Sequence, residues 1–467
     1  MAKLTIRNIT TETVVLKRVE RFGAKQVGTG NMLSNTLGTI TSMLNATNFT
    51  TSETRPEGDA RDTKDVDVKI DSFAAQTTDI EAPEPEKDVV RLQFEVAGKR
   101  YEVDVPSPND QSSVLRRLDQ NDKRELTAVY IPRHNFLAII SSTNHHAWMR
   151  EIRDDYPLSS LSIPGTHNSP TCYTALPSVR CQSVDIQDQL EAGVRFFDIR
   201  VSATPDNDNL ALVHSVFPIS LTGTKWLADL LNVVYGFLEA NPSETLVMSL
   251  KREGTGKGTD HDMSRYLRDR YVKSKKDAWY TRPSIPTLGE ARGKIVLMRR
   301  FGLADDVHKS ENDGKGFGID ASSWPDNCED GKCGSGLVRV QDFYEIDQST
   351  NIEKKINYSH AQLERAAEQL FAMPSSKDAK VPPLIVNFLS ASNFFNASCW
   401  PERIAAKVNP AVVEYLCMVH ADDGKGPKKL KTGDAATGIV VTDWVGAHGD
   451  WDLIRCIVGW NAKLKLK

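Results

Sequence analysis

The segment Leu161-Ser-Ile-Pro-Gly-Thr-His-Asn168 is a short apolar run that stops at a Pro-Gly corner and then presents a histidine. A strand of a parallel barrel delivers a side chain to the loop at its end in this way. Many Gly-X-His corners are ordinary turns, so the segment alone does not identify a site. The rest of the chain decides whether His167 belongs to one.

Length and composition limit the classes of protein to consider. The 467 residues are 40% hydrophobic and 26% charged, which predicts two domains or one large domain with an extension. The net charge of −4 gives no reason to expect nucleic acid as a partner. No apolar run reaches the about 18 residues of a membrane span, and residues 1–8 lack a signal-peptide core. We therefore expect a cytoplasmic protein without a transmembrane segment.

The seven cysteines are scattered along the chain. Cys328 and Cys333 are the closest pair, with a spacing that suits a loop disulfide or half of a zinc site. No second Cys or His pair has a suitable spacing, which favours reduced structural thiols over a zinc site.

Residues 1–142 predict a small all-β, sandwich-like N-terminal domain. Alternating segments at 4–10, 13–17, 89–96 and 99–105 are typical of strands, and Ala97-Gly98 is a hairpin signal. Residues from about 50 to 88 are rich in Thr, Asp, Glu and Pro, so we expect an acidic, disordered-like loop there. The domain carries no recognisable chemistry. A lipid- or protein-docking module and a purely structural extension both remain open.

Residues 143–467 alternate between strand-like and helix-like patterns. Eight short apolar segments end in polar or charged residues, at 158–163, 194–200, 210–214, 245–251, 294–300, 336–344, 384–390 and 438–444. Amphipathic stretches such as 226–238 lie between most of them. The pattern predicts an α/β fold, a TIM-type (β/α)8 barrel. The link from Arg200 to Leu210 is shorter than the about a dozen residues that a parallel crossover needs, so we expect the barrel to be irregular there.

The carboxyl ends of barrel strands meet at one face, where active sites are built. Period-2 alternation places Asp198 and Arg200 on the same face of one predicted strand, and Asp342 and Tyr344 on the same face of another. Asp198 and Arg200 could simply form a salt bridge. The predicted strand ends carry His167, Asn168, Asp198, Arg200, His214, Lys251, Glu253, Arg300, Asp342, Tyr344, Asn387, Ser390 and Asp443.

Two histidines, an arginine and partner carboxylates suggest acid–base attack on a phosphodiester. One histidine takes a proton from a hydroxyl nucleophile, and the other gives a proton to the leaving oxygen. A guanidinium offsets charge on the phosphoryl oxygens. No metal is needed if the nucleophile belongs to the substrate.

At this point the chain resembles the bacterial-type phosphatidylinositol-specific phospholipases C, whose catalytic unit is the X-domain barrel. The most specific matching pieces are Ser162-Ile-Pro-Gly-Thr-His167, Gly193-Val-Arg-Phe-Phe-Asp-Ile-Arg200 and Asn241-Pro-Ser-Glu-Thr245. Further pieces follow in family order over about residues 145–460, among them Trp324-Pro-Asp-Asn327, Val340-Gln-Asp-Phe-Tyr344 and Val440-Val-Thr-Asp443.

The resemblance implies a role for each matching position. His167 resembles the general base that acts on the inositol 2-hydroxyl, oriented by Asp443. His214 resembles the general acid, with Asp198 as its carboxylate partner, and Arg200 resembles the arginine that stabilises the phosphate. Lys251, Arg300, Asp342 and Tyr344 match positions that hold the inositol ring. The implied products are diacylglycerol and inositol 1,2-cyclic phosphate, which water then opens slowly.

Two positions bear on cofactors. Calcium-dependent relatives place carboxylates on the second strand, where this chain has Arg200, so we expect no metal and calcium independence. Bacterial enzymes usually have an aspartate after the base histidine, whereas this chain has Asn168, as the calcium-dependent relatives do; Asn168 is counted with the substrate-binding residues.

Other functions remain as alternatives. A catalytically weak phosphoinositide-binding protein would keep the pocket without turnover, and a phosphodiesterase for another lipid head group would need metal-binding carboxylates on the first strands. The expected partner is a phosphatidylinositol-type lipid at a membrane surface, where the protein would bind peripherally. Free, phosphorylated and glycosylated forms of the lipid are not distinguished. The apolar loop residues 216–221 could insert into a bilayer or be buried.

Overall fold

The computed structural model describes residues 2–28, 52–107, 112–142, 144–371 and 381–466. The chain divides into two compact units, Met1–Thr143 and Asn144–Lys467. Each unit has its own hydrophobic core.

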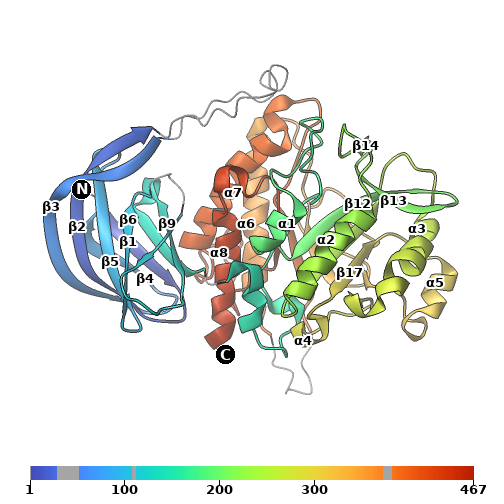
Figure 1. The fold of residues 1–467 in the computed structure, drawn as a ribbon, viewed down its shortest axis with the longest axis horizontal. Coiled ribbons are helices and arrows are strands. Elements are labelled where there is room, and N and C mark those ends of the chain that lie inside the picture. The colour runs from blue at the N-terminus through green and yellow to red at the C-terminus, as the bar shows by residue number, and fades with distance from the viewer. Residues whose placement is uncertain (1, 29–51, 108–111, 143, 372–380, 467) are drawn as a thin grey trace. The chain divides into compact units, whose positions relative to one another are not determined.

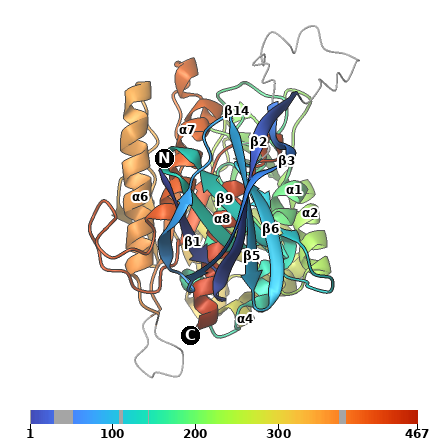
Figure 2. The same cartoon turned by 90° about the vertical axis from the view of Figure 1, so that its left-hand side faces the viewer.

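The described part of the first unit contains two five-stranded sheets, with strand orders β4-β1-β10-β9-β7 and β3-β2-β5-β6-β8. Apolar side chains from both sheets, such as Ile6 and Leu92, share one buried cluster. Figure 2 shows β2, β5 and β6 of the second sheet side by side. The predicted hairpin at Ala97-Gly98 joins β5 to β6, and both residues have positive φ, as a tight hairpin turn requires. The strands are β1 Lys3–Ile9, β2 Val14–Gly28, β3 Ser52–Ile70, β4 Ala75–Glu81, β5 Asp88–Val96, β6 Lys99–Val105, β7 Ser113–Val114, β8 Arg116–Arg117, β9 Leu126–Ile131 and β10 Phe136–Ser141.

The prediction of a disordered-like acidic loop at about 50–88 is wrong for its described residues, while residues 50 and 51 lie outside them. The stretch forms β3 and β4, and β3 pairs along β2 as an edge strand. An edge strand needs backbone partners rather than much buried apolar surface, so a polar composition does not prevent it. Its carboxylates also face cations of β2, with Asp67 at 2.5 Å from Lys17 and Asp65 at 3.6 Å from Arg18.

The second unit is built on a mostly parallel sheet with strand order β16-β17-β15-β12-β11-β22-β21-β20-β19. Helices lie along it, and α6, α7 and α8 form one neighbouring group (Figure 1). The main parallel strands are β11 Ile163–Thr166, β12 Phe196–Thr204, β15 Leu246–Arg252, β17 Ile295–Arg300, β20 Val338–Gln341, β21 Leu384–Phe388 and β22 Ile439–Thr442. The shorter strands are β13 Asn207–His214, β14 Phe217–Pro218, β16 Trp279–Tyr280, β18 Ile319–Asp320 and β19 Gly331–Lys332. The helices are α1 Ile186–Glu191, α2 Leu227–Ala240, α3 Asp260–Tyr266, α4 Leu288–Ala291, α5 Asp305–Ser310, α6 Ile352–Glu368, α7 Pro401–Met418 and α8 Asp452–Trp460. No helix among the described residues has the length and apolar character that crossing a membrane requires.

The prediction of eight parallel strands closing a barrel needs two corrections. The segment at 210–214 is β13, which pairs antiparallel with β12, because the short link at 205–206 allows a hairpin and no crossover. The described strands also do not close: β17 pairs with β15, β16 and β18, but no ladder joins it to β20. The chain between them holds only the two-residue strands β18 and β19, so an eighth full strand is missing.

A buried ion pair joins two of the three most specific sequence segments of this unit. Arg195 precedes β12 and Glu244 precedes β15, and both side chains are fully buried with 2.9 Å between Arg195 Nη2 and Glu244 Oε2. Arg195 also donates to the carbonyl oxygens of Leu190 and Val194, and Ser243 Oγ donates to Glu244. Since every charge is matched, the pair fixes the start of both strands.

We expect Glu244→Gln to destabilise the second unit by about 3–5 kcal/mol, because the substitution leaves the Arg195 guanidinium buried without a counter-charge. Asp155→Asn, which breaks the exposed pair with Arg153, should cost less than about 1 kcal/mol. Urea unfolding of both variants measures the difference. Equal losses for the two substitutions would contradict this account.

Candidate active site

His167 and Asp443 meet because their strands are neighbours. β11 and β22 run parallel with Thr166 opposite Thr442, so the next residue of each strand emerges at the same edge of the sheet. His167 Nδ1 lies 2.9 Å from Asp443 Oδ1, and both residues are buried. The carboxylate accepts the Nδ1 proton, so Nε2 is the ring nitrogen that can accept a hydrogen bond.

Arg200 is the centre of the charged network at the next strands. Its Nη2 lies 2.9 Å from His167 Nε2, its Nε donates to Asp198 Oδ2 at 3.2 Å, and its Nη1 donates to Glu253 Oε1 at 3.2 Å. Glu253 also accepts from Lys251 Nζ at 2.7 Å. The register of β12, β15 and β17 places Arg200, Lys251 and Arg300 in a row. Three cations therefore line one edge of the sheet.

Arg300 connects this row of cations to Asp342, another of the predicted ring-binding residues. Arg300 donates to Asp198 Oδ1 at 3.3 Å and lies 3.9 Å from Asp342 Oδ2. Its guanidinium covers the Trp324 ring at 3.8 Å, and Trp324 Nε1 donates to Asp342 at 2.9 Å. The sequence did not single out Trp324 as a site residue, although the segment that contains it matches the family.

Tyr344 stands apart from this network. Its hydroxyl donates to Asp326 at 2.9 Å, and its side chain is partly exposed. Within the described part of the chain, Tyr344 makes no direct hydrogen bond to the charged residues around Arg200.

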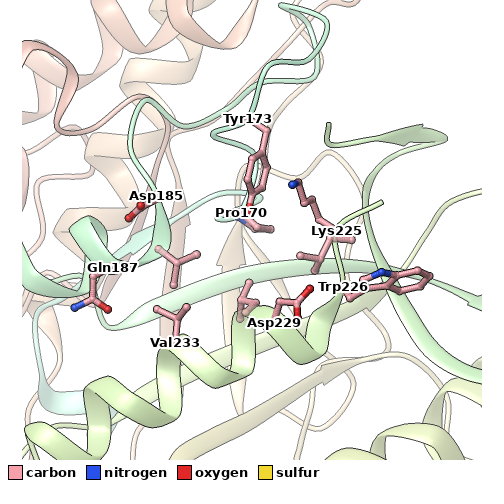
Figure 3. A pocket seen from close by; sticks show the side chains of 11 residues that line it. Pro170, Tyr173, Asp185, Gln187, Lys225, Trp226, Asp229 and Val233 are labelled. Atoms are coloured by element: carbon pink, nitrogen blue, oxygen red, sulfur yellow. The ribbon is translucent and has the colours of Figure 1, made fainter. Parts of the chain in front are cut away.

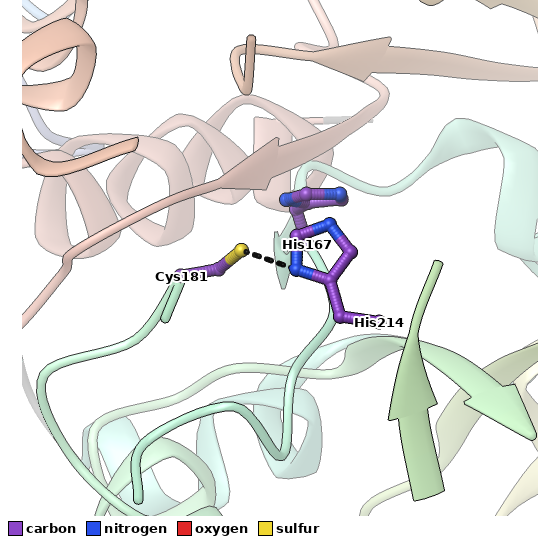
Figure 4. A group of neighbouring side chains, drawn as sticks. All are labelled: His167, Cys181 and His214. Carbon is purple, nitrogen blue, oxygen red and sulfur yellow. Dashed lines mark hydrogen bonds between the residues drawn. The ribbon is translucent and has the colours of Figure 1, made fainter. Parts of the chain in front are cut away.

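His214 is held differently from the prediction. Its Nδ1 lies 2.7 Å from the carbonyl oxygen of Val179 and 3.7 Å from Cys181 Sγ (Figure 4). Among the described residues no direct hydrogen bond joins His214 to Asp198, its predicted partner, whose two oxygens accept from Arg200 and Arg300. His214 ends the antiparallel strand β13 and so meets the loop at 176–181 instead. Its ring centroid is still 5.7 Å from that of His167.

Asn168 supports the site through its backbone. The residue is buried, adopts a left-handed φ of 39°, and donates its backbone N–H to Asp198 Oδ2 at 3.1 Å. Asparagine tolerates this conformation better than most residues. Its side-chain Oδ1 and Nδ2 have no hydrogen-bond partner among the described residues.

Burial and neighbouring charges set the protonation of the site. Burial opposes ionisation of Asp198, but Arg200 and Arg300 outweigh it and hold its pKa below the ordinary value. The same competition leaves the pKa of Glu253 at about 2, since Arg200 and Lys251 outweigh its burial. Burial, Arg200 and His167 together lower the pKa of His214 to about 3. Burial raises the pKa of Asp443 against the opposing effect of His167.

His167, Cys181 and His214 bring three potential metal-binding atoms within 4.8 Å of one another. Cysteine and histidine are ligands that zinc prefers. Here Arg200 already faces His167 Nε2, and the carbonyl of Val179 faces His214 Nδ1. A metal ion would therefore have to displace existing contacts, so this group is not a preformed metal site.

A separate cavity of about 290 Å³ lies between α2 and the segment that follows Asn168 (Figure 3). Leu212, Leu230 and Val233 form part of its apolar lining, and Lys225 Nζ lies 4.6 Å from the Tyr173 ring centroid. None of the predicted site residues lines this cavity, so it is distinct from the site.

Comparisons with known proteins match the part of the chain that contains several of these site residues. Residues 155–301 match the family model of the phosphatidylinositol-specific phospholipase C X domain. The match confirms the resemblance. A 1-phosphatidylinositol phosphodiesterase of Staphylococcus aureus strain Newman is 29% identical over 319 residues, covering 64% of this chain and 88% of that protein. One from Listeria monocytogenes is 35% identical over 172 residues, covering 34% of this chain and 50% of that protein.

Solved structures agree with this relationship. A crystal structure of a pentafluoro-Phe-containing phosphatidylinositol-specific phospholipase C from Staphylococcus aureus has a TM-score of 0.53 and 26% identity, and covers 68% of this chain and 97% of that chain. The chain is thus similar to the phosphatidylinositol-specific phospholipase C of Staphylococcus aureus over nearly the whole length of that protein.

We expect His214 to remain a neutral imidazole in the free protein between pH 5 and 8, because burial and Arg200 oppose its protonation. Its ring C–H resonances in heteronuclear NMR should then show no titration step in that range, with His214→Ala used for assignment. A His214 titration step between pH 5 and 8 would overturn the expectation.

Proposed function

We propose that this protein cleaves phosphatidylinositol to diacylglycerol and inositol 1,2-cyclic phosphate by two-histidine acid–base catalysis. The observation that carries the proposal is the orientation of His167. Asp443 binds Nδ1 of the ring, and the lone pair of Nε2 faces the guanidinium of Arg200. Guanidinium groups are well suited to binding phosphate. The names of the Staphylococcus and Listeria relatives give the substrate class.

The proposed first step uses His167 as the general base. Its Nε2 removes the proton from the inositol 2-hydroxyl, and the resulting oxygen attacks the adjacent phosphorus. The nucleophile and phosphate belong to one molecule, so the reaction has a large effective molarity and forms a five-membered cyclic phosphate. Arg200 stabilises the charge that develops on the phosphoryl oxygens.

The proposed general acid is His214, which gives a proton to the diacylglycerol oxygen as the P–O bond breaks. A phosphodiester anion beside the ring favours the imidazolium form and raises its pKa. In the free site, by contrast, Arg200 and burial favour the neutral ring. We therefore infer that bound substrate supplies part of the charge that makes His214 an acid.

We propose that the reaction needs no calcium. A calcium ion takes six to eight oxygen ligands. On the second strand, Asp198 has one oxygen bonded to Arg200 and the other to Arg300, and the Arg200 guanidinium occupies the space beside it. The positive charge that a metal would bring near the phosphate is supplied here by Arg200, Lys251 and Arg300.

The activity test uses purified protein, vesicles that contain phosphatidylinositol, and excess chelator. We expect diacylglycerol and the cyclic phosphate to appear, with turnover lost by at least about 100-fold in His167→Ala and in His214→Ala. His308→Ala, an exposed histidine of α5, serves as the control and should keep full turnover. Turnover that persists in both site variants would refute the mechanism, and activity restored only by calcium would refute metal independence.

We further propose that an apolar rim beside the site contacts the membrane surface. The rim consists of Val216, Phe217 and Leu221 after β13 and Phe394 and Phe395 after β21. Phe217 and Phe394 stack with 5.3 Å between ring centroids, and Phe395 is 95% exposed. Val216 lies two residues after His214, and exposed apolar groups next to a lipid-cleaving site favour insertion into the interface.

Phe395→Asp should weaken binding to phosphatidylinositol-containing vesicles by about tenfold or more, because burial of a phenylalanine in the bilayer is worth about 1.5–3 kcal/mol. Turnover of a short-chain, monomeric phosphatidylinositol should change little. Leu370→Asp is the matched control. Leu370 is 74% exposed but follows the C-terminus of α6, whereas the N-terminus of α6 contacts the segment after β20. Vesicle sedimentation that shows equal losses for both variants would argue against the rim.

A further inference from the structure

Lys355 is a buried cation that the proposed mechanism does not use. It lies in the first turn of α6 and is 0% exposed. Its Nζ donates to Gln341 Oε1 at 3.1 Å and to the carbonyl oxygen of Phe343 at 2.7 Å. The described residues give it no ion-pair partner, and both acceptors are neutral. A buried ammonium without a paired carboxylate is costly, so its position requires an explanation.

The inner face of α6 holds Lys355 rigidly against the sheet. Ser359 and Gln362 lie four and seven residues after it, on the same face of the helix. The Ser359 carbonyl oxygen accepts from Asn387 Nδ2 at 2.9 Å, and Gln362 Nε2 donates to the Val386 carbonyl oxygen at 3.2 Å. These bonds tie α6 to β21 directly below the ends of the strands.

Gln341 connects Lys355 to the predicted ring-binding segment. Its Oε1 accepts from Lys355 Nζ and from the backbone N–H of Phe343, the latter at 2.7 Å. Its Nε2 donates to Asn387 Oδ1 and to the carbonyl oxygen of Phe388, both at 2.8 Å. The Phe343 backbone is thus held at both its N–H and its carbonyl oxygen. Asp342 and Tyr344 are the residues on either side.

We propose that Lys355 is a positioning residue that fixes the 342–344 segment in the conformation that receives the inositol ring, and that its ammonium supplies a buried positive charge beneath Asp342 and Asp443. This inference rests on the proposed function. Lys355 does not touch the substrate in this proposal; it acts through Phe343 and Gln341.

The charge of Lys355 responds to pH in a defined direction. Burial lowers the pKa of Lys355 to about 7, while Asp342 and Asp443 at the strand ends and the thiol of Cys328 act to raise it. The unfolded chain keeps the lysine protonated up to its ordinary value of 10.5. Between about pH 7 and 10.5 the unfolded state therefore binds one more proton than the folded state, and stability rises with pH in this window. The ammonium is present at the site below about pH 7 and lost above it.

The test compares Lys355→Met with Lys354→Met, which removes an exposed lysine one position away on the same helix. The substrate is a short-chain phosphatidylinositol below its micelle concentration, so that membrane docking does not contribute. For Lys355→Met we expect KM to rise about tenfold, with kcat changed less than about threefold, because a pre-positioned binding segment is lost. The wild-type increase in KM as pH rises from 6 to 8 should be absent from Lys355→Met and retained in Lys354→Met.

Thermal unfolding at pH 6 and 9 separates positioning from folding. We expect Lys355→Met to remain folded and to lack the wild-type gain in Tm at the higher pH. If it does not fold, Lys355→Gln, which keeps a shorter polar side chain, takes its place in the same assays.

Unchanged KM and an unchanged pH profile in the folded variant would overturn the role of Lys355. A fall in apparent kcat in proportion to the unfolded fraction, with KM unchanged, would show a purely structural residue and overturn the proposal as well. Wild-type protein without turnover would overturn the proposed function, and this inference with it. Normal wild-type turnover with an unaffected Lys355→Met would overturn this inference alone.

Discussion

The arrangement of the site depends on the three contacts of the Arg200 guanidinium. It joins Asp198 on its own strand β12, Glu253 after the neighbouring strand β15, and His167 after β11, the neighbour on the other side. A charge buried in this way is stable only when its partners are in place, so the guanidinium fixes all three side chains relative to one another. His167 receives its orientation from Arg200 on one nitrogen and from Asp443 on the other.

Much of this network could be predicted because parallel strands bring their carboxyl ends to one edge. The residues at or next to the end of such a strand are His167, Lys251, Arg300 and Asp443. Arg200 lies within β12, which continues to Thr204, and a period of two residues places Asp198 beside Arg200. The partner of His214 could not be predicted in this way. β13 turns back along β12, so His214 at its end meets the backbone carbonyl oxygen of Val179. Every residue has a backbone carbonyl group, so the sequence does not indicate which one will be the partner.

Asn168 is a second feature that affects the charge around His214. An aspartate at this position would add a carboxylate close to the histidines, whereas Asn168 adds a neutral amide that has no partner among the described residues. His214 instead bonds to a carbonyl oxygen, which stabilises an imidazolium less than a carboxylate does. Its pKa is low because burial, Arg200 and His167 outweigh the opposing effects of the Val179 carbonyl oxygen and the Glu253 carboxylate. In the proposed mechanism, the acid step therefore depends on the substrate phosphate more strongly than it would with an aspartate.

Glu253 shows how the empty site balances its charges before a phosphate arrives. Its carboxylate accepts from Arg200, from Lys251 and from the backbone N–H of Ser215, directly after His214. A phosphoryl group that contacts Arg200 must share this guanidinium with Glu253, because Arg200 already bonds to Glu253, Asp198 and His167. Lys251 can keep Glu253 paired while Arg200 turns toward the phosphate. In the proposed mechanism, Lys251 thus allows Arg200 to leave Glu253 and bind the phosphate. This role is additional to the predicted contact of Lys251 with the inositol ring.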